Sequence, residues 1–241
     1  MMSNYEKLLS LAKINDEAER YDESFKYIDQ IANSKKEELT SEERTLLNSA
    51  YKNLINLRRD AWQNLNKCEI DNEKYVYLLT DIKSTVEKEL NDYCNRMLNL
   101  IDNVLFKNVK SDESKVFYIK MKADYYRYIA EISTGDKKNE IINKSISLYK
   151  EAQTLAEKLD DWNPVRLGLA LNFSDFYYEI MKDAKKAIEI ANERFEVAIN
   201  QLDKVDDDLY KDTTTILQLL KENIDNWTNE MKEGEKKEKK E

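Results

Sequence analysis

Residues 164–180 read PVRLGLALNFSDFYYEI, and apolar side chains recur around the whole circumference of the helix that this stretch would form. Pro164 suits the first turn of such a helix, because its fixed φ is already helical and its missing N–H is not needed there. A helix that is apolar all round has to be buried by other elements. The stretch therefore predicts a fold in which one central helix is covered by its neighbours.

The composition indicates that those neighbours are helices as well. The chain has three glycines and one proline in 241 residues, whereas roughly 12% of an ordinary protein is glycine or proline. Tight turns between strands depend on these two residue types. We therefore predict an all-α protein, and a hydrophobic content of 41% is that of a folded chain.

Caps and apolar periodicity predict nine helices. Thr40 and Ser111 are N-cap signals, and Gly135 is a stop signal. Because short loops make sequential helices antiparallel, we expect one stacked array in a single domain, residues 1–232, in which the pair at 166–202 is spaced like a tetratricopeptide unit. Residues 233–241, EGEKKEKKE, are expected to be a disordered tail. The expected helices span about 4–19, 22–36, 40–66, 71–106, 111–133, 138–159, 166–181, 184–202 and 209–231.

Several functions are excluded by the same composition. The chain has no histidine and two cysteines, Cys68 and Cys94, so we expect no enzyme activity, no catalytic residues, no metal and no cofactor, and two reduced, partly buried thiols. A net charge of -9 disfavours nucleic acid and membranes as partners. No stretch approaches the roughly 20 apolar residues that span a bilayer, and the first residues lack a signal-peptide core. We expect a cytoplasmic protein, with the nucleus as a second compartment.

Three helices carry polar residues seven positions apart, a spacing that returns them to nearly the same helix face. A solvated face explains any one such pair. Arg127 differs because tyrosines flank it, so that its stem must lie against apolar surface. An arginine held there needs an anion, which is either a fixed carboxylate or a ligand phosphate. The pairs are Lys52 with Arg59, Lys120 with Arg127, and Asn172 with Glu179.

Two amides interrupt apolar stripes. Asn172 lies in the central stretch, and a buried carboxamide must find hydrogen-bond partners. These are either groups of the same chain or the backbone of an extended peptide, which offers a donor and an acceptor at every residue. The last helix repeats the pattern, and ordinary core packing also explains it. Its residues are Ile216, Leu219, Leu220, Asn223 and Trp227.

Six segments, which span nearly the whole chain, resemble one known family. They are AERYDE at 18–23, EERTLLNSAYKN at 42–53, RRDAW at 58–62, ESKVFYIKMKADYYRYIAE at 113–131, PVRLGLALNFSDFYYEI at 164–180 and YKDTTTILQLLKENIDNW at 210–227. Together they resemble the 14-3-3 family of phosphoserine- and phosphothreonine-binding adaptors. The resemblance implies a helical array whose amphipathic groove binds phosphorylated segments of partner proteins and so regulates their activity or localisation.

The resemblance also implies residue roles. The phosphate pocket is matched by Lys52, Arg59, Arg127 and Tyr128. Other peptide contacts are matched by Lys120, by the amides of Asn172 and Asn223, by Glu179 and Trp227, and by an apolar wall of Leu171, Ile216 and Leu219.

Three groove positions depart from the family pattern. Asp175 stands where the family usually has valine, and Asn226 and Thr215 stand where it usually has leucine. A carboxylate near a bound dianion repels it. We expect weaker or altered peptide binding, with a preference for a basic residue near the phosphate.

The resemblance further implies a homodimer or heterodimer formed by the helices at about 4–36. Interface positions are matched by Ile14, Ala18, Arg20, Glu23, Ile82 and Glu89. Arg20 and Glu89 match one intersubunit ion pair, but Glu23 would face Thr85 where the family usually has lysine, and Ile82 replaces a tyrosine. One missing surface pair costs only about 0–1 kcal/mol, so a dimer is still expected.

Two rival functions stand beside the adaptor. The first is a divergent helical scaffold that binds unmodified segments, and Asp175 with Asn226 motivates it. The second is a helical dimer that shapes membranes, although the chain lacks the basic face that anionic lipid requires.

Overall fold

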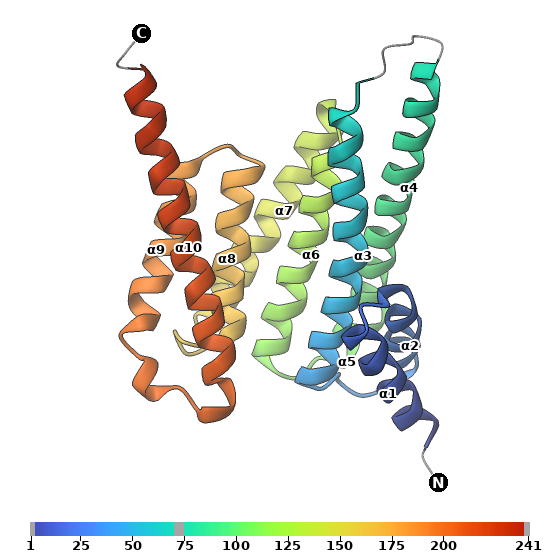
Figure 1. Ribbon diagram of the computed structural model, residues 1–241. Coiled ribbons are helices and arrows are strands. Elements are labelled where there is room, and N and C mark those ends of the chain that lie inside the picture. The colour runs from blue at the N-terminus through green and yellow to red at the C-terminus, as the bar shows by residue number, and fades with distance from the viewer. Residues whose placement is uncertain (1–2, 70–74, 239–241) are drawn as a thin grey trace. The chain divides into compact units, whose positions relative to one another are not determined.

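The computed structural model describes residues 3–69 and 75–238, and those residues form helices and loops without a strand (Figure 1). Nine long helices lie within these ranges, which confirms the predicted all-α class. The chain divides into two compact units. The first comprises Met1–Lys110 with Ile132–Thr134, and the second comprises Ser111–Glu131 with Gly135–Glu241.

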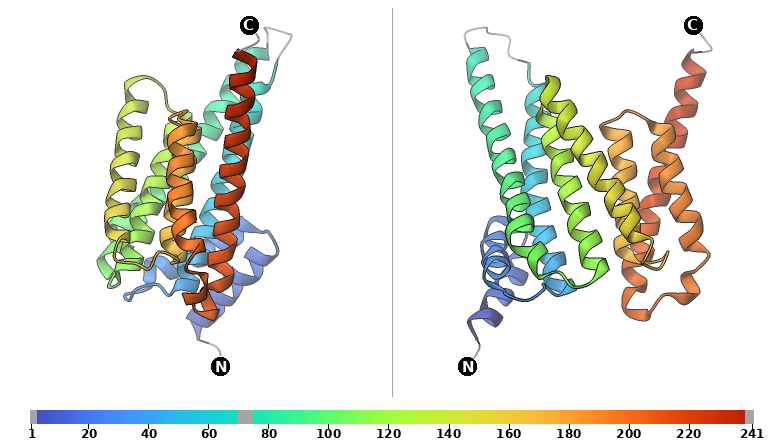
Figure 2. Two further views of the ribbon diagram at one scale, coloured as in Figure 1. Left: turned by 90° about the vertical axis from the view of Figure 1, so that its left-hand side faces the viewer. Right: turned by 180° about the vertical axis from the view of Figure 1, so that it is seen from behind.

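The first unit is built on contacts of α1 with α2, of α2 with α3, and of α3 with α4 (Figure 2). A short π-helix, η2, joins α4 to the one-turn helix α5, so that the three run on as one element. Its helices are α1 (Asn4–Glu17), α2 (Tyr21–Ser34), α3 (Ser41–Lys67), α4 (Val76–Leu100), η2 (Ile101–Leu105) and α5 (Phe106–Asn108). The predicted start of the fourth helix at Asp71 lies outside the described residues.

The second unit is organised around α8, the helix predicted to be central. Its residues Leu169, Phe173 and Phe176 pack into a core shared with α6 and α7, and Leu167 packs into a second core shared with α9 and α10. The predicted burial of this helix is therefore confirmed. The helices are α6 (Asp112–Ile132), α7 (Gly135–Ala156), α8 (Pro164–Glu179), α9 (Ala184–Ile199), η3 (Leu202–Lys204) and α10 (Asp207–Glu238).

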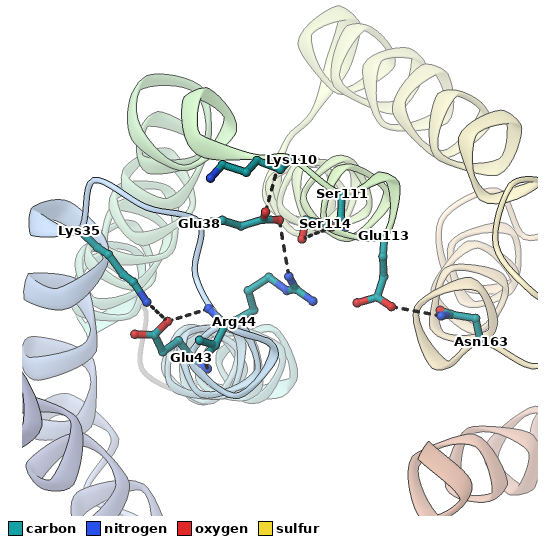
Figure 3. A network of polar contacts seen from close by, with 10 residues as sticks. Lys35, Glu38, Glu43, Arg44, Lys110, Ser111, Glu113, Ser114 and Asn163 are labelled. Atoms are coloured by element: carbon teal, nitrogen blue, oxygen red, sulfur yellow. Dashed lines mark hydrogen bonds and ion pairs between the residues drawn. The ribbon is translucent and has the colours of Figure 1, made fainter. Parts of the chain in front are cut away.

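Helix starts follow the cap signals. Thr40 forms a capping box with Glu43 at the start of α3, and the Glu43 carboxylate also accepts from Lys35 Nζ at 2.5 Å (Figure 3). At the start of α8 the Asn163 side chain accepts from the N–H of Val165 at 2.9 Å, directly before Pro164. These contacts satisfy donors that a helix N-terminus otherwise leaves unpaired.

The C-terminal end differs from the prediction. The last helix was expected to end near residue 231, but α10 continues to Glu238. Glu and Lys are strong helix formers, and a Lys/Glu-rich segment continues an existing helix without the cost of a new nucleus. The expected disordered tail, 233–241, is thus helical over its first residues, and 239–241 lie outside the described residues.

The two cysteines also differ from the prediction that both are partly buried, since Cys94 is buried and Cys68 is exposed.

A buried acid links the helices of the first unit. Asp29 of α2 is 5% exposed, and its carboxylate accepts from Tyr51 Oη of α3 at 2.6 Å and from Arg96 Nη2 of α4 at 2.6 Å. Asn33 Nδ2 adds a third contact at 3.0 Å. Burial first, and then the Asp29 charge, raises the pKa of Tyr51, so its hydroxyl stays protonated and donates.

We predict that Tyr51→Phe lowers the free energy of unfolding by about 1.5–3 kcal/mol, because it removes one charge-assisted donor from a buried carboxylate. Urea unfolding followed by circular dichroism measures the loss. Tyr126→Phe is the matched control, since Tyr126 is only half-buried and its ring lies under Lys144 Nζ at 4.4 Å. Equal stability of the two variants would contradict this role of Asp29 and Tyr51.

Candidate functional site

A second buried acid, Asp124 of α6, organises the polar residues of the second unit. It is 4% exposed and accepts from Lys120 Nζ at 3.0 Å, from Tyr149 Oη of α7 at 2.6 Å and from Asn172 Nδ2 of α8 at 2.8 Å. The donors come from three helices. Asp124 is not among the predicted site residues; the signal for it in the sequence is a carboxylate four residues after Lys120 on a face that is otherwise apolar and aromatic.

The cations around Asp124 keep it ionised. Burial alone raises the pKa of a carboxyl group, but the charges of Lys120 and Arg127, together with the hydrogen bonds from Tyr149 and Lys120, outweigh burial and lower the pKa of Asp124. An ionised Asp124 holds Lys120 and Asn172 in fixed positions.

Arg127 is the most constrained cation of the unit. It is 6% exposed, its Nη1 donates to Glu179 Oε2 at 2.9 Å, and its guanidinium lies 4.8 Å from the centroid of the Tyr128 ring. Burial lowers the pKa of Arg127, but the surrounding groups, Tyr128 foremost, outweigh burial and raise that pKa well above its ordinary value. Within the described residues its buried Nε–H has no hydrogen-bond partner.

The anion that Arg127 requires is thus a carboxylate in the unliganded chain. Glu179 is far more exposed than Arg127, with 46% of its side chain accessible against 7%. An exposed carboxylate is easily displaced, because it regains hydration when it leaves. The pair therefore presents a buried cation beside an exposed counter-charge.

Both predicted peptide-binding amides are engaged within the chain. Asn172 donates to Asp124, and Asn223 Nδ2 of α10 donates to Asp175 Oδ1 of α8 at 2.8 Å. Of the two alternatives for the amides, the structure shows the intramolecular one. Each carboxamide also has a second N–H and an acceptor oxygen, so each amide can form further hydrogen bonds beside the one to its carboxylate.

The predicted apolar wall is divided between surface and core. Leu219 is 43% exposed, whereas Trp227 is 6% exposed and stacks on Tyr178 with ring centroids 4.8 Å apart. Leu171 and Ile216 are half-buried. Trp227 belongs to the core of α8, α9 and α10, so its ring serves packing first. The other two departures, Thr215 and Asn226, are exposed.

Two residues of the predicted phosphate pocket belong to the first unit. Lys52 is exposed and Arg59 is half-buried on α3, and Arg59 Nη1 donates to Asn56 Oδ1 at 3.3 Å. Arg127 and Tyr128 belong to the second unit, and their combination with Lys52 and Arg59 in one pocket stays a prediction.

The predicted dimer positions are exposed or paired within the chain. Ile14 and Ile82 are 61% and 53% exposed, and Ala18 and Arg20 are exposed as well. Glu23 pairs with Lys26 at 2.7 Å, and Glu89 pairs with Arg58 at 3.1 Å. The dimer interface at these positions stays a prediction.

Other site types find no support in the part of the chain that the structure describes. No group of three or more Cys, Asp or Glu side chains there has the arrangement of metal ligands. No helix there is long and apolar enough to cross a membrane.

Comparison with known proteins identifies relatives over nearly the full length. The family model "14-3-3 protein" matches residues 11–228. The chain is 45% identical to 14-3-3-like protein D of Nicotiana tabacum over 235 residues, which cover 95% of this chain and 94% of that protein. It is 43% identical to 14-3-3 protein 2 of Entamoeba histolytica over 97% of this chain and 100% of that protein, and 43% identical to 14-3-3-like protein 2 of Caenorhabditis elegans over 95% and 94%.

We predict that Asp124→Asn lowers the free energy of unfolding at pH 7 by about 3 kcal/mol, because it leaves Lys120 buried without the carboxylate that pairs with it. The pKa of Asp124 is lower in the folded chain than its ordinary value of 3.8. The stabilisation is therefore complete above that value and is lost as the pH falls through the folded pKa.

Urea unfolding between pH 7 and pH 2 tests the prediction. The acid limb of the stability curve should be flatter in Asp124→Asn than in the parent. Asp225→Asn removes an exposed carboxylate of the same unit and serves as the control. Parallel curves for Asp124→Asn and the parent would show that Asp124 is not the acid-sensitive group.

Proposed function

Because this chain belongs to the 14-3-3 family, we propose that it acts as a non-enzymatic adaptor that binds phosphoserine- and phosphothreonine-containing segments of partner proteins. The observation that carries the proposal is Arg127. Its guanidinium is buried, charged and short of one hydrogen-bond partner within the described residues, and its counter-charge is an exposed glutamate.

A phosphate group suits this arrangement better than Glu179 does. A phosphomonoester carries about -1.5 to -2 charge and three acceptor oxygens, and a guanidinium binds such a group through two parallel hydrogen bonds. The Tyr128 hydroxyl, 3.4 Å from Arg127 Nη2, adds a neutral donor. We propose that Lys52 and Arg59 complete the pocket and that Lys120 lies beside it.

The peptide backbone would then exchange partners with the amides. Asn172 and Asn223 each hold a carboxylate in the unliganded chain, and each has donor and acceptor capacity left for an extended segment. Leu171, Ile216 and Leu219 would contact its apolar side chains, and Trp227 would support them from the core.

Asp175 is proposed to set the specificity of this groove. It occupies one N–H of Asn223, so a peptide must either share that amide or displace the carboxylate. A basic side chain in the peptide would compensate the charge of Asp175, whereas an apolar one would not. The preferred segment therefore has a lysine or arginine close to its phosphorylated residue.

The second candidate function is a scaffold that binds unphosphorylated segments. The engagement of Asn172 and Asn223 by carboxylates favours it, because these contacts compete with an incoming backbone. One peptide measured with and without its phosphate separates the two functions, and equal affinity would support the scaffold.

The oligomer and the compartment are part of the proposal. The exposed Ile14 and Ile82, with Ala18, Arg20, Glu23 and Glu89, are proposed to form a homodimer or heterodimer interface. A dimer would bridge two phosphorylated segments and raise their apparent affinity through effective concentration. We place this activity in the cytoplasm, with the nucleus as a second compartment, and expect no cofactor, nucleic acid or membrane partner.

We predict that Arg127→Ala and Arg59→Ala each abolish detectable binding of a phosphoserine peptide of the RSxpSxP type. Charge-assisted bonds to a desolvated phosphate contribute several kcal/mol, and the loss of one donor leaves the others imperfectly matched. Isothermal titration with the phosphorylated peptide and its unmodified twin, beside light scattering for mass, measures affinity, stoichiometry and oligomeric state.

Arg194→Ala is the matched control for these variants, because Arg194 pairs with Asp161 at 3.0 Å and belongs to no predicted site. The affinity of Arg194→Ala for the phosphorylated peptide should stay within about threefold of the parent's affinity, which is a loss of binding free energy under roughly 0.7 kcal/mol. Affinity retained to the same degree in Arg127→Ala or Arg59→Ala would mean that the phosphate pocket lies elsewhere.

We predict that Asp175→Val raises the affinity for an ASxpSxP peptide, which has no basic residue beside its phosphoserine, about three- to tenfold, or roughly 0.7–1.4 kcal/mol, because it frees Asn223 and removes a charge that repels the phosphate. Asp175→Asn keeps an acceptor for Asn223 but removes the charge, so comparison of the two variants separates the hydrogen bond from the electrostatic effect. Unchanged affinity in both would show that Asp175 does not act on the peptide.

A further inference from the structure

A polar pocket on the first unit lies between α2 and the continuous element formed by α4 and η2. It has a cavity volume of about 580 Å³, within the usual range for ligand sites. Its lining is dominated by carboxamides, which come from Asn33, Asn95, Asn99 and Asn103. None of the residues assigned above to phosphopeptide binding or to the dimer lines this pocket.

The π-turn explains how three of these asparagines share one face. Residues four apart on an α-helix advance by about 40° beyond a full turn, so the third member of such a series rotates away. Here Asn103 lies in η2, where the N–H of Phe106 bonds to the carbonyl of Ile101. A π-turn closes over five residues instead of four and advances less per residue, which brings Asn103 back into line with Asn95 and Asn99.

The spacing of Asn95 and Asn99 matches an extended polypeptide. The four residues from one to the other rise about 6 Å along the α-helix, and two residues along an extended strand rise about 6.6 Å. A strand exposes an N–H and a C=O on one edge at every second residue, and a carboxamide can both donate and accept. Within the described residues no hydrogen bond engages the side chains of Asn95, Asn99 or Asn103, which are all exposed.

The lining of the pocket also includes charged side chains. Arg96 is fixed by Asp29 and lies 4.8 Å from the centroid of the Phe25 ring, so Asp29 is neutralised in place. Asp92 stands one turn before Arg96 on α4, is exposed, and has no ion-pair partner within the described residues. The pocket therefore offers one uncompensated carboxylate beside the row of amides.

We propose that this pocket is a second peptide-binding site that takes an extended, unphosphorylated segment. Asn95, Asn99 and Asn103 bond to alternate backbone groups of the segment, and Asp92 pairs with a lysine or arginine side chain. Such a site recognises the peptide backbone and one basic side chain, so it tolerates many side chains at the other positions of the segment. The site is independent of the phosphopeptide groove and does not need phosphorylation.

The probe for this site is a capped octapeptide of alternating threonine and lysine, which favours the extended form and carries basic side chains. The parent protein, labelled with ¹⁵N at its asparagines, is titrated while the side-chain NH₂ resonances are followed. We expect the resonances of Asn95, Asn99 and Asn103 to shift together, with a Kd at or below about 1 mM. Two control peptides have the same sequence, one N-methylated at every threonine and the other at every lysine, so each lacks the backbone N–H groups along one edge of the extended segment. The control that lacks the N–H groups facing the asparagines should bind at least tenfold more weakly.

Variants test the row of amides itself. Asn99→Ala should weaken binding about three- to tenfold, as expected for one hydrogen bond, and the triple variant Asn95→Ala, Asn99→Ala, Asn103→Ala should remove it. Alanine favours the helix over asparagine, so these variants keep their fold, which circular dichroism checks. Asn139→Ala, an exposed position on α7, should bind like the parent.

Three results would overturn the proposal. The first is the absence of any shift of the three resonances at about five times the expected Kd. The second is binding that survives the triple variant or is retained by both methylated control peptides. The third is a shift of the same resonances with trehalose but not with the octapeptide, which would assign the pocket to a polyhydroxylated small molecule.

Discussion

The ionised carboxylate of Asp124 is the constraint on which the second unit depends. A buried charge is costly unless donors surround it, and here the donors come from α6, α7 and α8. The three helices must therefore keep their relative positions for Asp124 to remain charged. The same contacts hold Lys120 and Asn172 in place and help to keep the neighbouring Arg127 protonated. The hydrogen bonds that stabilise this unit therefore also position the residues proposed to bind the phosphopeptide.

The residues proposed to bind the phosphopeptide are paired with carboxylates of the chain itself. Glu179 accepts from Arg127, and Asp175 accepts from Asn223. A ligand gains only the difference between its own contacts and those it displaces. Glu179 is exposed, whereas Asp175 is half-buried. This difference supports the proposal that Arg127 provides affinity for a phosphate and that Asp175 provides selectivity.

Each of the two units contains a buried aspartate with the same kinds of hydrogen-bond partners. Asp29 and Asp124 are each buried, and each accepts from a tyrosine hydroxyl at 2.6 Å and from a cation. A tyrosine donor satisfies a carboxylate without adding charge, so one cation suffices to balance it. In the first unit Arg96 pairs with Asp29 and lines the same pocket as the asparagines, and the π-turn that follows brings Asn103 toward the others. The further peptide site proposed here depends on both features.

The sequence by itself determined the features that are local along the chain. The all-α class, the start of α3 at Thr40, the start of α8 at Pro164 and the burial of α8 follow from composition, capping and periodicity, which act over a few residues. Arg127 was also identifiable, because its aromatic neighbours require a buried stem. The extension of α10 to Glu238 could not be predicted, because balanced charge alone does not distinguish a helix from a disordered tail.

Only the tertiary structure decided which hydrogen-bond donor meets which acceptor. Asn172 meets Asp124 across 48 residues, and Asn223 meets Asp175 across another 48. The pocket of asparagines likewise requires that α2 pack beside α4 and that one turn widen into a π-turn. Periodicity assigns a residue to a face of its own helix but says nothing of what that face meets. Hydrogen bonds and ion pairs form over about 3 Å, so their partners are set by packing between helices that are distant in sequence.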